Sequence, residues 1–388
     1  MKLLVLLAIA AAASAADEPA ELRTRAVALI AQGKYAEAEP LLVAVLATRG
    51  KELPPDDPGL SPDLRALAAL YRAQGRGPDA EKIYLEDLQI QEKSAGLASA
   101  ALLPDLKDLA TLYASLARNT DAEKQYLRAI SIRLDSAPDS LDLAHDYADL
   151  AAFYIAQKRF AVAEPNLRRA IEITQKQQGR DAAALVPLLD TLATALIEQK
   201  NYQPAETPLR RALSIAETAS GPSHPDVAPR LDRLAMLYDM MKRYAEAEPL
   251  YRRSLAIWES VTGPSSQETA TALDNLAVTL ASQEKFDEAE PLYRRSLALH
   301  QTVTVAALNN LAMDLEGTGR DTAAERYYKQ AQSLAERLSD HTMLAFTLHN
   351  YAGLLHRLHR EVEAKRAEVR AKALENESAP ARAPAMRQ

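Results

Sequence analysis

The sequence predicts an all-helical protein built from stacked repeats, and three observations lead to this prediction. Alanine and leucine, which favour helices, are frequent, whereas the chain of 388 residues has only four Phe and one Trp. The segments that begin at Tyr244 and Phe286 are near copies of each other, 42 residues apart. The central alanine of this block recurs at Ala38, Ala80, Ala122, Ala163, Ala205, Ala247, Ala289, Ala324 and, more weakly, Ala364. A regular step of this kind is typical of a solenoid.

The composition excludes several other classes of protein. The chain contains no Cys, which removes disulfides, thiolate metal sites and cysteine nucleophiles. Its formal net charge of -7 argues against a general nucleic-acid or anionic-membrane binder. The hydrophobic fraction of 48% is large enough for a sizeable core, so general disorder is not expected.

Residues 1–15 have the pattern of a secretory signal peptide. The basic start Met1-Lys2 precedes an apolar run from Leu3 to Ala13, and an A-x-A cleavage pattern ends at Ala15. The alternative is a membrane anchor, but a spanning helix needs about 20 apolar residues and this run is shorter. We therefore expect a periplasmic or secreted protein of bacterial type, with no membrane span in the mature chain.

Each repeat is predicted to form two helices. In the best-defined repeat, the first helix spans Pro229 to Met241, the pattern breaks near Lys242, and a second periodic run includes Ala247 and Tyr251. We expect about nine such hairpins over residues 16–373, followed by a disordered tail at 374–388. The step from Ala289 to Ala324 is only 35 residues, which predicts a local change of curvature near residues 300–307.

The spacing L-x2-L-A-x2-Y…A-x3-Y resembles the tetratricopeptide repeat, whose pattern is W-x2-L-G-x2-Y…A-x3-F…P. It is met, for example, by Leu106, Leu109, Ala110, Tyr113, Ala122 and Tyr126. The 42-residue step and the phrase E-A-E-P-L-Y-R-R-S-L are similar to the repeats of kinesin light chain and related bacterial proteins. The resemblance implies a right-handed superhelix of helix-turn-helix hairpins, in which the first helices line a concave groove.

The first helix of each repeat has an alanine of its own, such as Ala235 or Ala277, and the position two residues before it is predicted to face this groove. It is occupied by Asp108, Asp149, Thr191, Arg233, Asn275, Asn310 and Asn350. The last three form a row of asparagines, each of which offers a donor and an acceptor to the backbone of an extended peptide. The resemblance to kinesin-light-chain repeats implies the same role. Alternatively, these asparagines satisfy neighbouring helix ends.

The preceding position carries a second row, formed by Asp190, Asp232, Asp274 and Asn309. Carboxylates in a row would favour basic or hydroxyl-bearing ligands. They would equally suit a solvated helix face near helix N-termini, where they complement the helix dipole. The candidate groove residues are therefore Asn275, Asn310, Asn350, Asp190, Asp232, Asp274, Arg233 and Asn309.

Other residue groups have simpler interpretations. Met236, Met240, Met241 and Met313 are expected to fill core gaps rather than line an adaptable binding surface. Arg252 and Arg294 follow Glu248 and Glu290 by four residues, which predicts ion pairs on an exposed helix face. His349, His356 and His359 have spacing that could bind Zn or Ni, but no third ligand is evident. We expect no metal and no cofactor.

The sequence thus predicts an exported scaffold that binds a peptide or protein segment in its groove and is not an enzyme. It has no G-x-S-x-G elbow and no Walker A loop. Two alternatives stay open. One is a structural spacer in an envelope assembly. The other is an enzyme with a site in the groove, acting on cell-wall or polysaccharide material.

Overall fold

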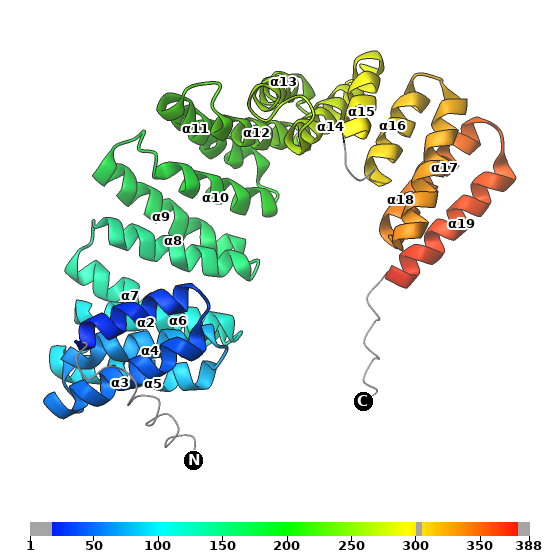
Figure 1. Cartoon of the computed structure of the whole chain (residues 1–388). Coiled ribbons are helices and arrows are strands. Elements are labelled where there is room, and N and C mark those ends of the chain that lie inside the picture. The colour runs from blue at the N-terminus through cyan, green and yellow to red at the C-terminus, as the bar shows by residue number, and fades with distance from the viewer. Residues whose placement is uncertain (1–17, 300–304, 379–388) are drawn as a thin grey trace, which may run out of the picture. The chain divides into compact units, whose positions relative to one another are not determined.

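The computed structural model describes residues 18–299 and 305–378. Within these ranges the chain forms 18 α-helices and three short 3-10 turns, and it has no strand. In chain order the helices alternate as the first and second members of nine hairpins, which confirms the predicted all-α solenoid (Figure 1). The handedness of the superhelix stays a prediction. The chain divides into two compact units, residues 1–195 and 196–388, and the boundary falls inside one helix, α10.

The first unit contains four complete hairpins and the start of a fifth. In order, its helices are α2 (Pro19–Ala31), α3 (Tyr35–Glu52), α4 (Ser61–Ala73), α5 (Gly77–Ala95), α6 (Leu103–Ser115), α7 (Asn119–Ser136), α8 (Leu141–Ala156), α9 (Phe160–Gln178) and α10 (Leu185–Glu198). The 3-10 turns η1 (Pro58–Leu60) and η2 (Ala100–Leu102) lead into α4 and α6.

The second unit continues the same alternation. Its helices are α11 (Tyr202–Ser220), α12 (Ala228–Met240), α13 (Tyr244–Val261), α14 (Gln267–Ser282), α15 (Phe286–Leu299), α16 (Val305–Gly317), α17 (Asp321–Leu338), α18 (His341–Arg357) and α19 (Glu361–Ser378), with the 3-10 turn η3 (Pro225–Val227) before α12. Helix α19 extends five residues beyond the expected end of the solenoid at residue 373. Residues 1–15 and 379–388, and residues 300–304 of the short junction, lie outside the described part, so the predictions made for them stay predictions.

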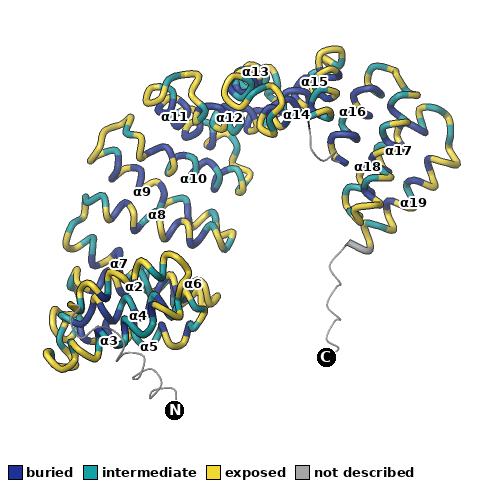
Figure 2. The backbone as a smooth tube through the Cα atoms, viewed as in Figure 1, coloured by how far each residue is buried: buried dark blue, intermediate teal, exposed yellow. Residues whose placement is uncertain are grey.

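The repeated alanines lie at the closest contacts between helices. All nine, from Ala38 to Ala364, are completely buried. A small side chain at this position lets two helices approach and interdigitate their larger neighbours. Buried residues therefore form stripes along the helices, while exposed residues follow their outer faces (Figure 2).

The turn inside each hairpin has one residue in the left-handed conformation. In the sixth hairpin it is Lys242, with φ of 59°, and the next amide, of Arg243, donates to the carbonyl oxygen of Tyr238 at 2.8 Å. This 6→1 bond closes the end of the first helix. The corresponding residues are Gly33, Gly75, Ala117, Lys158, Lys200, Glu284, Gly319 and His359. The break that the sequence shows after Met241 is this turn.

An inter-hairpin clamp joins consecutive hairpins within each unit. The glutamate that follows the buried alanine of a second helix pairs with the cation that precedes the next second helix. Glu206, for example, accepts from Arg243 at 2.6 Å and from the hydroxyl of Tyr238 at 2.9 Å. The guanidinium of Arg243 also lies 4.4 Å from the centre of the Tyr238 ring. The pairs are Glu39–Arg76, Glu81–Arg118, Glu123–Arg159, Glu206–Arg243, Glu248–Lys285, Glu290–Arg320 and Glu325–Arg360.

The predicted ion pairs on the second helices are confirmed. Arg252 lies 2.8 Å from Glu248, and Arg294 lies 2.7 Å from Glu290. Glu248 and Glu290 therefore serve both a cation of their own helix and one of the next hairpin. No helix in the described ranges is long and apolar enough to cross a membrane.

Candidate binding surface

The predicted row of asparagines lies on three first helices of the second unit, α14, α16 and α18. Asn275 and Asn310 are half-buried, and their side-chain amides have no hydrogen-bond partner among the described residues. Asn350 is also half-buried, and its Nδ2 donates to Oδ1 of Asn309 at 3.2 Å. Two of the three amides are thus available to a ligand, and the third is held in place by a neighbour.

Asn309 does not face a ligand, contrary to the prediction. Its side chain is completely buried between helices. Its Nδ2 contacts Sδ of Met313 at 3.4 Å, and its Oδ1 accepts from Asn350. Because α16 turns by about 100° per residue, the position next to Asn310 points into the protein. Asn309 therefore positions Asn350.

The row of aspartates is also turned away from a simple solvated face. The carboxyl of Asp232 lies near Ser254 and Trp258 of α13, and burial raises its pKa. Asp274 lies close enough to Tyr293 of α15 for its charge to help raise the pKa of that hydroxyl, after burial and the charge of Asp314. These two side chains are directed toward the second helix of their own hairpin. Asp190 on α10 and Arg233 on α12 are half-buried.

Apolar side chains form a second exposed row on the first helices. Met236, Val278 and Met313 directly follow the alanines of their first helices, Ala235, Ala277 and Ala312, and are 40%, 40% and 44% exposed. Met240 is 44% exposed and Met241 is half-exposed. The prediction that these methionines fill the core was wrong, because they occupy the helix face that no neighbouring helix covers. Flexible thioethers at a surface are typical of adaptable binding sites.

The two rows meet at a cavity of about 370 Å³ in the second unit. Its lining comes from α14, α15 and α16: Val278, Ala281, Ser282, Phe286, Tyr293, Asn310, Met313 and Asp314. Val278, Phe286 and Met313 give it apolar walls. Asn310, from the predicted asparagine row, contributes an amide, so the candidate groove includes a defined pocket.

Asp314 provides the charge of this cavity and was missed by the sequence analysis. Its side chain is 1% exposed, and neither carboxylate oxygen has a hydrogen-bond partner among the described residues. Burial, and secondarily the charge of Asp287, raises the pKa of Asp314 to about 7. The sequence does contain a signal, because the corresponding position of most other repeats holds a buried apolar residue, such as Leu70, Leu112, Phe153, Leu237 or Leu354, although one repeat has Thr279 there.

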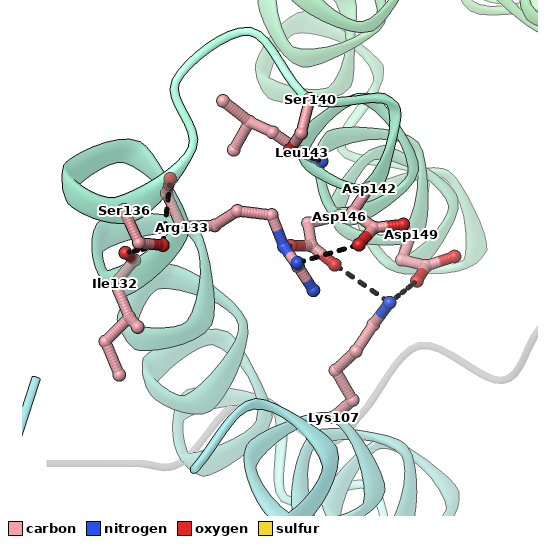
Figure 3. A network of polar contacts seen from close by, with 9 residues as sticks. All are labelled: Lys107, Ile132, Arg133, Ser136, Ser140, Asp142, Leu143, Asp146 and Asp149. Carbon is pink, nitrogen blue, oxygen red and sulfur yellow. Dashed lines mark hydrogen bonds and ion pairs between the residues drawn. The ribbon is translucent and has the colours of Figure 1, made fainter. Parts of the chain in front are cut away.

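In the first unit, two buried carboxylates are paired with cations. Asp146, in the second turn of α8, is 2% exposed and lies 2.8 Å from Nζ of Lys107 on α6 and 2.5 Å from Nε of Arg133 on α7 (Figure 3). Lys107 also reaches Asp149, one of the predicted groove positions, at 3.2 Å. Asp63 is paired in the same way, with Arg23 at 2.8 Å and Arg49 at 3.3 Å.

A buried pair of carboxylates occurs between these two sites. Asp87 and Asp105 are 0% and 1% exposed, and Arg65 lies 3.8 Å and 4.0 Å from them. Burial, followed by the charge of Asp87, raises the pKa of Asp105 to about 8. Since one half-exposed arginine cannot balance two buried charges, the pair retains a proton at neutral pH.

The histidines of the last hairpin bind glutamates of α19. His349 lies 2.9 Å from Glu375, and His356 contacts Glu361 at 2.8 Å and Glu368 at 3.0 Å. The hydrogen bond to Glu368, together with Glu361, raises the pKa of His356. Within the described residues no group of three or more His, Asp or Glu is placed to hold a metal ion. His359 occupies the left-handed turn position.

Comparison with protein families identifies the repeats. Two models described as tetratricopeptide repeat match the chain, one over residues 141–218, 205–260, 226–302 and 303–374, the other over 22–59 and 64–100. The chain belongs to the tetratricopeptide repeat family. This fold generally serves as a scaffold for protein–protein interaction. No curated protein matches the chain.

Solved structures with the same fold include three of interest. The apo form of RapI is 17% identical with a TM-score of 0.62, covering 93% of this chain and 99% of its own. Aspartyl phosphate phosphatase F from Bacillus subtilis is 16% identical with a TM-score of 0.51, covering 93% and 94%. Repeats of a putative kinesin light chain from Podosopora anserina are 21% identical with a TM-score of 0.47, covering 52% and 96%. At these identities the likeness to the first two structures shows the fold alone.

Proposed function

We propose that this tetratricopeptide repeat protein is a scaffold that binds an extended segment of a partner protein along α14, α16 and α18. The observation that carries the proposal is the pair of half-exposed amides, Asn275 and Asn310, which lack internal partners and recur in phase. Val278 and Met313 lie one turn further along the same helices and are exposed in phase with them. Polar and apolar contacts are therefore available side by side along one surface.

The chemistry of this surface suits a peptide backbone. An extended segment has unpaired amide and carbonyl groups, and each asparagine side chain can donate to one and accept from the other. Exposed valine and methionine side chains supply contact area with little demand on sequence. A surface that is formed before binding also reduces the ordering cost of association.

We further propose that the protein works outside the cytoplasm. The basic start, apolar run and A-x-A pattern of residues 1–15 support export. Expression in a bacterial host, followed by mass analysis of the protein from the periplasm, tests this. The expected product begins at Ala16, and a full-length protein retained in the cytoplasm would contradict export.

The binding proposal is tested with a displayed library of unstructured 12-residue peptides selected on the full chain. Affinities of the selected peptides are then measured by calorimetry for the unchanged protein and for the triple variant N275A/N310A/N350A. Loss of two amides that contact a peptide should weaken binding by roughly tenfold or more, at about 1 kcal/mol for each hydrogen bond.

A matched control replaces Asn119 and Asn166 by alanine, on second helices of the first unit. Peptides should bind this variant and the unchanged chain equally. Peptides that bind the triple variant as tightly as the unchanged protein would refute the assignment of the surface. A library that yields no binder at all would favour the spacer alternative.

A further inference from the structure

The cavity between α14, α15 and α16 is large enough to receive a side chain. Its volume of about 370 Å³ is at the lower end of the range of small-ligand pockets, which is too small for a folded segment. Val278 and Met313 form its exposed rim, and Phe286 forms one wall. The Phe286 ring packs directly on α16, because a Cβ added at Gly317 would lie only 2.5 Å from Cζ of the ring.

Asp314 gives this pocket a charge that nothing in the described protein balances. Both carboxylate oxygens are buried and unpartnered, and the ionisable groups whose charges couple to Asp314 are Asp287 and Tyr293, neither of which is a cation. A buried carboxylate without a partner is costly, and native structures seldom keep one without a role. The contrast with Asp146 and Asp63, which each have two cations, is direct.

The residues that line the pocket limit which ligand group could pair with Asp314. A metal ion would need further oxygen or nitrogen ligands, and the lining offers mainly apolar surface around Asp314. An arginine side chain fits both parts of the pocket. Its methylene stem can lie against Val278 and Met313, and its planar fork can donate to two oxygens of one carboxylate.

We propose that this pocket receives an arginine side chain of the bound segment, with the guanidinium donating to both oxygens of Asp314. The proposal rests on the proposed peptide-binding function and adds a sequence preference to it. Asn310 lies on the same lining, and its amide oxygen can accept one of the remaining guanidinium N–H groups. Lysine is the less suitable occupant because a single ammonium cannot form the two parallel bonds that both free oxygens offer.

The first test uses small probes on the full chain. N-acetyl-argininamide, the uncharged isostere N-acetyl-citrullinamide and N-acetyl-lysinamide are titrated while NMR follows the methyl groups of Val278 and Met313. We expect the arginine probe to bind with a dissociation constant on the order of a millimolar. The citrulline probe should bind roughly 30-fold more weakly, because it lacks the charge that Asp314 requires.

Variants separate the pocket from the rest of the surface. Asp314→Asn, which preserves the shape of the side chain, should weaken binding of the arginine probe by roughly 30-fold. Asp135→Asn, at an exposed site on α7, should leave it unchanged. Equal binding of arginine and citrulline probes, or unchanged binding by Asp314→Asn, would overturn the proposal. Equal or tighter binding of the lysine probe would overturn the assignment to arginine.

The selected peptides distinguish failure of this inference from failure of the proposed function. If both hold, the peptides that depend on the asparagine row will share an arginine, and its replacement by citrulline will weaken them. Peptides that depend on the asparagines but lack arginine and ignore Asp314→Asn would refute the pocket assignment alone. Probe binding without any peptide binder would instead contradict the proposed function.

Discussion

Replacing Asp314 with asparagine should stabilise the second unit, and the gain should increase with pH. Burial raises the pKa of this carboxyl from its ordinary value of 3.8 to about 7, so the folded state holds the proton more tightly than the unfolded state does. The favourable contribution is fully present below pH 3.8 and is lost as pH rises through 7. At about 1.4 kcal/mol per unit, the asparagine variant should gain about 1.5 kcal/mol at pH 5 and about 4 kcal/mol at pH 8.

Urea denaturation at pH 5, 6, 7 and 8 measures this difference. The only tryptophan, Trp258 on α13, lies in the second unit and reports its unfolding by fluorescence. Asp135→Asn serves as the control and should show no pH-dependent gain. A stability difference between Asp314→Asn and the unchanged protein that is the same at pH 5 and pH 8 would refute the reasoning, since it would mean that Asp314 titrates alike in both states.

Three further predictions concern the polar network, the turns and the last hairpin. Lys107→Met should destabilise the first unit by about 2 kcal/mol in urea denaturation, because it leaves the buried Asp146 with one cation in place of two. Lys242→Gly should raise stability by about 1 kcal/mol in the same assay, because it removes the cost of a side chain at a positive φ. In NMR titrations His356 should lose its proton above the ordinary pKa of 6.5, and Glu368→Gln should lower that pKa, because the hydrogen bond to Glu368 favours the charged ring.

Each of these predictions has a matched control. Lys107→Arg keeps the cation and should cost much less than Lys107→Met. The Lys-to-Gly change at Lys372, inside α19, should destabilise by about 1 kcal/mol, the opposite sign to Lys242. Glu336→Gln, which removes the partner of Arg370, should leave the titration of His356 unchanged. An equal effect of the change and its control would count against the stated cause in each case.

The repeat pattern predicted the fold well because it repeats a packing requirement. Each central alanine must be small for its helices to approach, so the same letter recurs wherever the same contact recurs. The sequence does not predict which residues take the left-handed turn conformation, because three of the nine are glycine and six are not. The conformation is imposed by the hydrogen bonds of the turn. The sequence does not predict the inter-hairpin clamps either. The two residues of each clamp are 30 to 37 residues apart and become neighbours only when consecutive hairpins stack.

The candidate surface was predicted in part. Asn275 and Asn310, counted from Ala277 and Ala312, are half-buried and their side chains lack hydrogen-bond partners among the described residues, but the neighbouring position turns Asn309 inward. The direction of Asp232 toward α13 depends on how the second helix of the same hairpin packs against α12, and the helical spacing alone does not specify this. Asp314 is recognisable in the sequence as a polar residue at a repeat position that is usually apolar. That its carboxylate has no partner in the described chain is visible only once α14, α15 and α16 are packed together.

The inter-hairpin clamps have a consequence for the mechanics of the chain. Each clamp, such as Glu206 with Arg243, joins one hairpin to the next and to no other. Under tension along the chain, the load passes through these links in series, so the hairpins should yield one after another rather than together. Each event would release about one 42-residue step, roughly 140 Å of contour length. The protein would then behave as an extensible tether whose force trace shows evenly spaced drops.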